Sequence, residues 1–127
     1  MNKMKVITLK QPWATLVAEG LKKYEFRSWK LNYRGEILIH AGKSIDKEAM
    51  LKFKSLNLEY SKSQIVAKVI IEDCIELNEK NNKIIMKENS VIYGNKINRT
   101  GYAWKLKSVE KINSQEKISG KQGIWNI

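Results

Sequence analysis

The segment from residue 5 to residue 43 constrains the fold most, because turn-forming residues divide it into short elements of different type. Residues 5–9 are a β-branched run typical of a strand. Pro12 suits the first position of a helix, where its missing N–H would be unpaired in any case, and Gly20 is the expected stop of that helix. A chain built from such short elements predicts a sheet with small helices packed on it.

Residues 23–27 return to the period of two that is typical of a strand. Tyr24 and Phe26 are therefore expected on one side of it, and Glu25 and Arg27 on the other. An ordinary core does not need charges beside large rings. Arg forks onto phosphate or a base edge, and an aromatic ring stacks on a planar group. The segment thus predicts a site for a planar, polar and anionic ligand.

The remaining elements predict an α+β domain spanning residues 1–127. Further strands are expected at residues 35–41, 64–77 and 102–112, and in a short C-terminal stretch that carries Trp125 and closes the sheet. A second helix is expected after Ser44 as its N-cap. The segment 78–100, rich in Asn, Lys and Glu, predicts a long loop with one helical turn. Together these elements favour a small, mostly antiparallel β-barrel with helices over its openings.

The net charge of +11, from 24 Lys and Arg against 13 Asp and Glu, would attract polyanions such as RNA. Arginine occurs only at Arg27, Arg34 and Arg99, and the abundance of Lys, Asn and Ile is typical of AT-rich coding, which accounts for part of the charge. Cys74 is the single cysteine, so no internal disulfide forms. With no long apolar run, a cytoplasmic protein without membrane contact is expected.

Three spaced motifs carry a resemblance to a known family: QPWA at residues 11–14, GLKKYEFRSW at residues 20–29 and YRGEILIHA at residues 33–41. The chain ends with YAW at residues 102–104 and GKQGIW at residues 120–125, which extend the likeness over nearly its whole length. The sequence resembles the ASCH (activating signal cointegrator homology) domain family. This resemblance implies a PUA-like fold related to domains that bind RNA or modified bases.

The resemblance also implies a ligand cleft between the barrel and the first helix, lined by Gly20, Lys22, Glu25 and Arg27. One branch of the wider family is similar to an amidohydrolase of acetylated cytidine that uses a lysine, a threonine nucleophile and a glutamate. Lys22 stands at the lysine position, whereas Glu25 replaces the threonine. That mechanism therefore does not transfer unchanged.

The preferred interpretation is an RNA- or nucleotide-binding domain with a basic cleft. Its candidate ligand-binding residues are Lys22, Glu25, Arg27, Trp29, Arg34, Lys43 and Lys121. The first alternative is a hydrolase in the same cleft, either an amidohydrolase of a modified nucleoside such as acetylated cytidine or a ribonuclease. In it Glu25 activates water, and Lys22 or Arg27 stabilises negative charge. The second is a protein-interaction module in transcription or translation, which would expose an apolar patch.

Several of these residues also have a purely structural interpretation. Lys22, Glu25 and Arg27 would then form a solvated charge cluster, and Arg34 would anchor its turn through backbone carbonyls. His40 is expected to be a hydrogen-bonded structural residue. Trp13, Trp104 and Trp125 are predicted in the core, and Trp29 is the better candidate for an exposed ring. No metal or cofactor is expected, because one carboxylate is weak support for a metal site and only Glu72 and Asp73 are further candidates near Glu25. A monomer is favoured.

Overall fold

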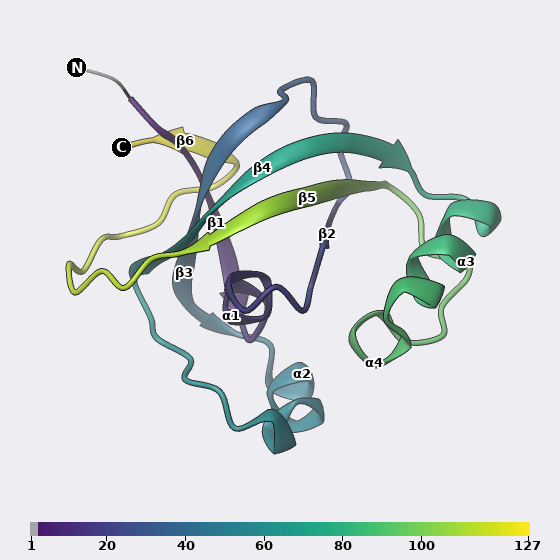
Figure 1. Cartoon of the computed structure of the whole chain (residues 1–127), viewed down its shortest axis with the longest axis horizontal. Coiled ribbons are helices and arrows are strands. Elements are labelled where there is room, and N and C mark those ends of the chain that lie inside the picture. The colour runs from purple at the N-terminus through teal and green to yellow at the C-terminus, as the bar shows by residue number, and fades with distance from the viewer. Residues whose placement is uncertain (1–2) are drawn as a thin grey trace.

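Six strands form one strongly curved, mixed sheet in the computed structural model, which describes residues 3–127 (Figure 1). The strand order is β2-β5-β4-β3-β1-β6; β1 and β3 run parallel, and every other neighbouring pair is antiparallel. The strands are β1 (Lys5–Gln11), β2 (Tyr24–Arg27), β3 (Gly35–Ile45), β4 (Gln64–Glu76), β5 (Tyr102–Lys111) and β6 (Ile124–Asn126).

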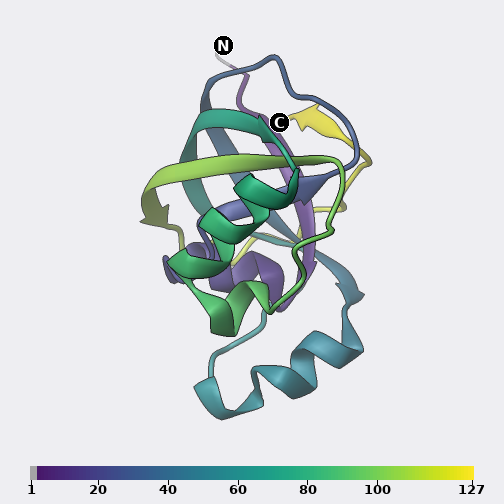
Figure 2. The same ribbon diagram turned by 90° about the vertical axis from the view of Figure 1, so that its right-hand side faces the viewer.

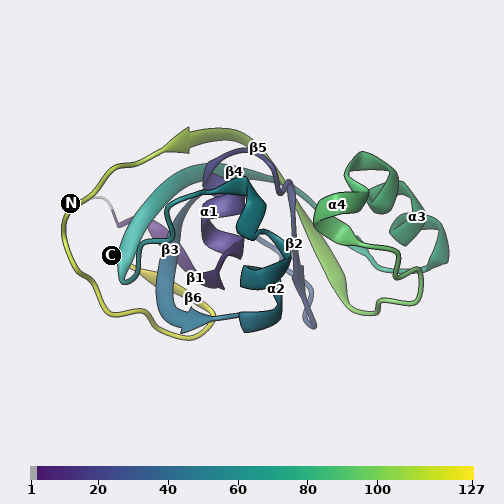
Figure 3. The ribbon, with the colours of Figure 1, turned by 90° about the horizontal axis from the view of Figure 1, so that it is seen from below.

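The helices are short, and one of them packs inside the curve of the sheet. The inner helix, α1 (Trp13–Ala18), lies within the curve of the sheet, where residues 14–18 are buried (Figure 3). The others are α2 (Lys47–Lys52), the 3-10 turn η1 (Lys54–Leu56), α3 (Glu79–Glu88) and α4 (Ser90–Tyr93). The start of β1 and the C-terminal strand β6 lie at the opposite end of the molecule from α3 and α4 (Figure 1). Figure 2 shows α2 below the rest of the molecule. None of the helices within residues 3–127 has the length and apolar character that crossing a bilayer requires.

The prediction of a loop over residues 78–100 was wrong, because this segment forms α3 and α4. Asparagine is typical of loops, but here Asn78 and Asn89 are N-caps whose side chains accept hydrogen bonds from the backbone N–H groups of Asn81 and Ile92. The buried Ile85 and Ile92 give the two helices an apolar side. The polar composition of the segment therefore concealed two capped helices.

Element ends also differ from those expected around α1 and α2. Strand β3 continues to Ile45, where it pairs with Gln11 of β1, so Ser44 lies within the strand. The N-cap of α2 is Asp46, whose side chain accepts from the backbone N–H of Ala49 at 3.1 Å. Pro12 precedes α1 as its N-cap residue rather than occupying its first position, and the Gln11–Pro12 peptide bond is cis.

The α+β sheet is strongly curved and mostly antiparallel, as expected, but it stays open, so its expected closure into a barrel was wrong. Strands β2 and β6 form the two edges, and β6 covers β1 only along Lys5–Ile7. Beyond that point, no strand within residues 3–127 pairs with the second edge of β1. A side chain of β2 reaches this edge, because Arg27 Nη2 donates to the Thr8 carbonyl at 3.2 Å. With four residues, β2 is too short to complete the closure. An opening therefore remains between β2 and the carboxyl-terminal half of β1.

Two apolar clusters hold the elements around this opening. The larger fills the curve of the sheet with residues such as Ile39, Val69 and Trp104. The second packs Phe53 and Tyr93 with residues of α1, α3 and β2, and so fixes α2 and α4 beside the opening. The fold thus surrounds the open side of the sheet with two helices from distant parts of the chain.

Candidate ligand pocket

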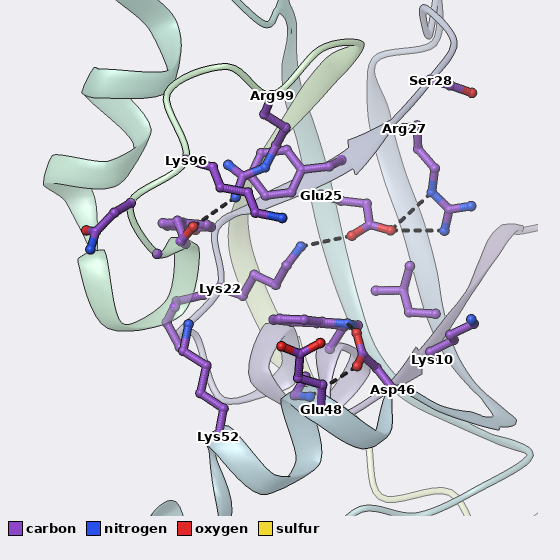
Figure 4. Close-up of a pocket in the computed structure, with 18 of the residues that line it drawn as sticks. Lys10, Lys22, Glu25, Arg27, Ser28, Asp46, Glu48, Lys52, Lys96 and Arg99 are labelled. Atoms are coloured by element: carbon purple, nitrogen blue, oxygen red, sulfur yellow. Dashed lines mark hydrogen bonds and ion pairs between the residues drawn. The ribbon is translucent and has the colours of Figure 1, made fainter. Parts of the chain in front are cut away.

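A pocket of about 770 Å³ occupies the opening between β1 and β2 (Figure 4). Its walls come from the end of β1, the start of α1, β2, α2, and α4 with the loop that follows it. Six cationic side chains line it: Lys10, Lys22, Arg27, Lys52, Lys96 and Arg99. Three acidic ones do so as well: Glu25, Asp46 and Glu48. The excess of positive charge makes the pocket suited to an anionic ligand.

Lys22, Glu25 and Arg27, hereafter the buried trio, form a row of ion pairs along one wall. Lys22 Nζ donates to Glu25 Oε1 at 2.9 Å, and Arg27 Nε donates to Glu25 Oε2 at 3.1 Å. Lys22 Nζ also donates to the Tyr24 carbonyl. Lys22 and Glu25 are only 3% and 9% exposed. The expected pairing is present, but its interpretation as a solvated surface cluster was wrong.

Local sequence explains how the trio comes together. Gly20 follows the end of α1 with φ at +75°, the left-handed conformation that glycine adopts readily. The backbone N–H groups of Leu21 and Lys22 then donate to the Leu16 carbonyl, which turns the chain back across the end of α1. Strand β2 follows, and its alternation places Glu25 and Arg27 on one side, as predicted.

The opposite side of β2 packs on α4. Tyr24 and Phe26 both meet the Tyr93 ring edge to face, with ring centroids 5.9 Å apart in each pair. The Tyr93 hydroxyl accepts hydrogen bonds from the backbone N–H groups of Lys23 and Tyr24, at 2.7 and 3.1 Å. Tyr93 therefore fixes α4, and with it one wall of the pocket, to the start of β2.

The charge state of Glu25 follows from its neighbours. Burial by itself raises the pKa of this carboxyl group, but the positive charges of Lys22 and Arg27 and their hydrogen bonds outweigh burial, so the pKa lies below its ordinary value of 4.5. Glu25 is therefore an ionised carboxylate at neutral pH, and each of its oxygens accepts a hydrogen bond from a cation.

Aromatic rings lie beside the trio. Trp13 was predicted in the core, and its ring does pack edge to face on the buried Phe53, with ring centroids 5.7 Å apart. It is only half-buried, however, and also lines the pocket, with its Nε1 donating to Asp46 Oδ2 at 3.2 Å. Lys22 Nζ lies 5.7 Å from the centroid of the Trp13 ring and 5.2 Å from that of Phe26. Trp104 and Trp125 are buried, as predicted. The pocket therefore offers both charges and ring faces.

Four cationic residues of the pocket were not foreseen from the sequence. Lys10 lies at the end of β1 and Lys52 in the last turn of α2; Lys96 and Arg99 follow α4. The Arg99 guanidinium lies 4.3 Å from the centroid of the Phe26 ring, and its Nη2 donates to the Tyr93 carbonyl at 2.8 Å. The sequence signal that could have identified Arg99 is the scarcity of arginine, since Arg99 is one of only three arginines in the chain.

Trp29 and Arg34, two of the predicted site residues, do not line this pocket. The Trp29 ring is 39% exposed, as expected, and lies edge to face on Trp104 with ring centroids 5.0 Å apart. Arg34 donates to the carbonyls of Leu31 and Tyr33 at 2.9 and 3.1 Å. These are the contacts of a turn anchor.

Lys43 and Lys121 also lie outside the pocket lining. Lys43 is an exposed residue of β3, and Lys121 Nζ lies 5.9 Å from the centroid of the Trp125 ring. His40 is fully buried and bonds to Thr8 Oγ1 at 3.1 Å and to the Ile118 carbonyl at 2.6 Å, which confirms its structural role. None of these three side chains lines the pocket that holds the trio.

No cluster of three or more His, Cys, Asp or Glu side chains suited to a metal occurs within residues 3–127. The two carboxylates considered beside Glu25 have other partners: Glu72 pairs with Lys105 at 3.7 Å, and Asp73 with Arg34 at 3.5 Å. The polar chemistry of the pocket is therefore that of its cations, its three carboxylates and its hydrogen-bonding groups.

A curved, mostly antiparallel sheet with small helices and a basic pocket at its open side is consistent with the PUA-like class of α+β domains. The sequence profile of the ASCH domain matches residues 7–118 of the 127 residues, and the chain belongs to this family. No curated protein sequence matches the chain significantly.

Proposed function

We propose that this ASCH domain binds single-stranded RNA or a nucleotide, with one base held in the pocket between β1 and β2. The observation that carries the proposal is the combination, in one cavity of about 770 Å³, of six cations with the half-buried ring of Trp13. Cavities of this size accommodate small organic ligands. The general association of the ASCH family with RNA binding supports the same ligand class.

Each part of the pocket matches one part of a nucleotide. The ring of Trp13 offers a stacking surface, which is how proteins bind unpaired bases. The cations supply attraction to phosphate, which is independent of sequence. Asp46 and Glu48 also line the pocket, and carboxylate oxygens accept hydrogen bonds from the amino and imino groups of a base edge. Recognition of a base and of the backbone attached to it would thus use different walls of one pocket.

The proposal is tested by the fluorescence anisotropy of a short labelled single-stranded RNA, titrated at several salt concentrations. Binding is expected to weaken as salt increases, because phosphate contacts release counterions. Trp13→Leu should weaken binding by roughly tenfold, the loss expected from one stacked base. An affinity that does not change with salt, or an unchanged affinity of Trp13→Leu, would refute the proposal.

Trp29→Leu is the matched control. Trp29 is 39% exposed and lies outside the pocket, so the same substitution there removes an exposed indole without altering the pocket lining. The sequence prediction assigned stacking to Trp29, whereas we propose Trp13 for this role. A larger loss from Trp29→Leu than from Trp13→Leu would place the bound base outside the pocket. Thermal unfolding of both variants shows whether either loss reflects reduced stability instead.

A further inference from the structure

We infer that Lys52, Lys96 and Arg99, hereafter the cationic cluster, form a phosphate subsite that makes the pocket select a phosphorylated nucleotide over its nucleoside. This inference rests on the proposed function and deepens it. The cluster lies outside the GLKKYEFR motif, on α2 and on the loop after α4. It adds a second binding element on the wall across from Arg27 (Figure 4).

Separate parts of the chain bring the cluster together. Lys52 Nζ lies beside Gly94, within 3.9 Å of where a Cβ on this glycine would be, so the end of α2 meets the loop after α4. Figure 4 shows Lys96 and Arg99 on the same side of the pocket, with the Lys96 ammonium extending into it. Arg99 is held on the Phe26 ring and by the Tyr93 carbonyl.

The charges of the cluster differ from those of the buried trio. In the trio, Glu25 pairs with both Lys22 and Arg27 at 2.9 Å. Within residues 3–127, no carboxylate forms an ion pair with Lys52, Lys96 or Arg99. Glu48 precedes Lys52 by one helical turn without pairing with it. Three positive charges at one side of the pocket are therefore left without a negative partner.

Arg99 provides an independent observation. Its Nη1 is buried and has no hydrogen-bond partner, although Arg99 lines the pocket. Burial lowers the pKa of its guanidinium, with the neighbouring Tyr93 acting in the opposite direction. A buried donor without an acceptor is costly. An anionic oxygen at this side of the pocket would supply the missing negative charge, and also the acceptor once the guanidinium turns Nη1 toward the pocket.

The chemistry of the cluster selects the anion. Two ammonium groups and one guanidinium offer several donors along one side of the pocket, and a phosphate offers several terminal oxygens and up to two negative charges. On the opposite wall Lys22 and Arg27 are already paired with Glu25, so the unpaired cations of the cluster are the stronger site for a phosphate. A nucleotide thus fits in one orientation, with its phosphate at the cationic cluster and its base toward Trp13.

The test is isothermal titration calorimetry of the chain with the four common ribonucleosides and their 5′- and 3′-monophosphates. At least one monophosphate should bind about tenfold more tightly than its nucleoside, the effect of one charge-assisted hydrogen bond. Lys52→Ala and Lys96→Ala should each reduce this preference several-fold and leave the affinity for the nucleoside unchanged. Both lysines are exposed and without ion pairs, so folding should be preserved.

Two further variants sharpen the result. Arg99→Lys keeps the charge but removes the planar fork, and it should also lower the preference for phosphate. Lys107→Ala, on an exposed residue of β5 outside the pocket, removes the same charge as the lysine variants and should change nothing. Comparison of RNA with and without a terminal phosphate shows whether the bound group is a chain end or an internal phosphodiester.

The outcomes separate this inference from the proposed function. Equal affinity for nucleoside and monophosphate, or equal losses for both in Lys96→Ala, would overturn the phosphate subsite while Trp13-dependent RNA binding stands. An effect of Lys107→Ala as large as that of Lys96→Ala would reduce the cluster to general surface charge and overturn it too. Absence of binding by every nucleoside, nucleotide and RNA would overturn both.

Discussion

Replacing Glu25 with glutamine tests the account of the buried trio directly. The variant keeps the size of the side chain but removes its charge, so Lys22, which is 3% exposed, loses its anionic partner. Glutamine has one carbonyl oxygen, whereas Glu25 accepts from Lys22 on one oxygen and from Arg27 on the other. One of these cations must then face an amide NH₂ group.

The expected loss of folding free energy is about 3 kcal/mol, the scale for removing one partner from a buried, hydrogen-bonded ion pair. This should lower the unfolding temperature by about 10 °C in a domain of this size. Urea unfolding at neutral pH measures the difference. Glu79→Gln is the matched control, because Glu79 pairs with Lys83 at 3.0 Å on an exposed helix face and its loss should cost less than about 0.5 kcal/mol.

The pH dependence gives a second test of the same reasoning. The pKa of Glu25 is lowered in the folded state, so its stabilising contribution is complete above its ordinary value of 4.5 and is lost as the pH falls through the lower folded-state pKa. Protonated glutamic acid and glutamine are both neutral. The stability difference between the wild type and Glu25→Gln should therefore disappear in acid, and a difference independent of pH would refute the argument.

The remaining predictions concern how the walls of the pocket are fixed. Tyr93→Phe should lower stability by about 2 kcal/mol, measured by urea unfolding, because two backbone N–H groups at the start of β2 lose their acceptor. Gly101→Ala should cost about 2 kcal/mol or more, since φ is +98° and a Cβ there would lie 2.7 Å from the Arg27 carbonyl oxygen. Gly20→Ala, with φ at +75° but open space around it, should cost only about 1 kcal/mol; equal losses from the two glycine variants would contradict the steric argument.

The sequence predicted those parts of the fold that local patterns determine. The period of two over residues 23–27 correctly separated Glu25 and Arg27 from Tyr24 and Phe26, because alternation is a property of any strand. The long β4 strand was predicted to within one residue. Local patterns could not predict whether the sheet closes into a barrel. That depends on which edge of the sheet β6 occupies and on the length of β2.

The same distinction applies to the pocket. The buried trio lies within one short stretch and could be identified from its motif, although its burial depends on tertiary packing, in which the ring of Trp13 from α1 lies beside Lys22. Lys52 and Lys96 have no local feature that separates them from the other lysines of the chain. Only the approach of α2 to the loop after α4, near Gly94, brings them to one site.

The charge state of Glu25 also bears on the alternative function predicted from the sequence, a hydrolase in which Glu25 activates water. A general base is most effective when its pKa lies near the working pH, and burial is the usual means of raising a carboxyl pKa to that range. Here Lys22 and Arg27 reverse the effect of burial and occupy both oxygens. Deprotonation of water by Glu25 would therefore be unfavourable unless a ligand first drew one cation away. An anionic ligand bound at the cationic cluster would not draw Lys22 or Arg27 away, because it pairs with other cations. The geometry therefore favours Glu25 as the group that holds Lys22 and Arg27 in position.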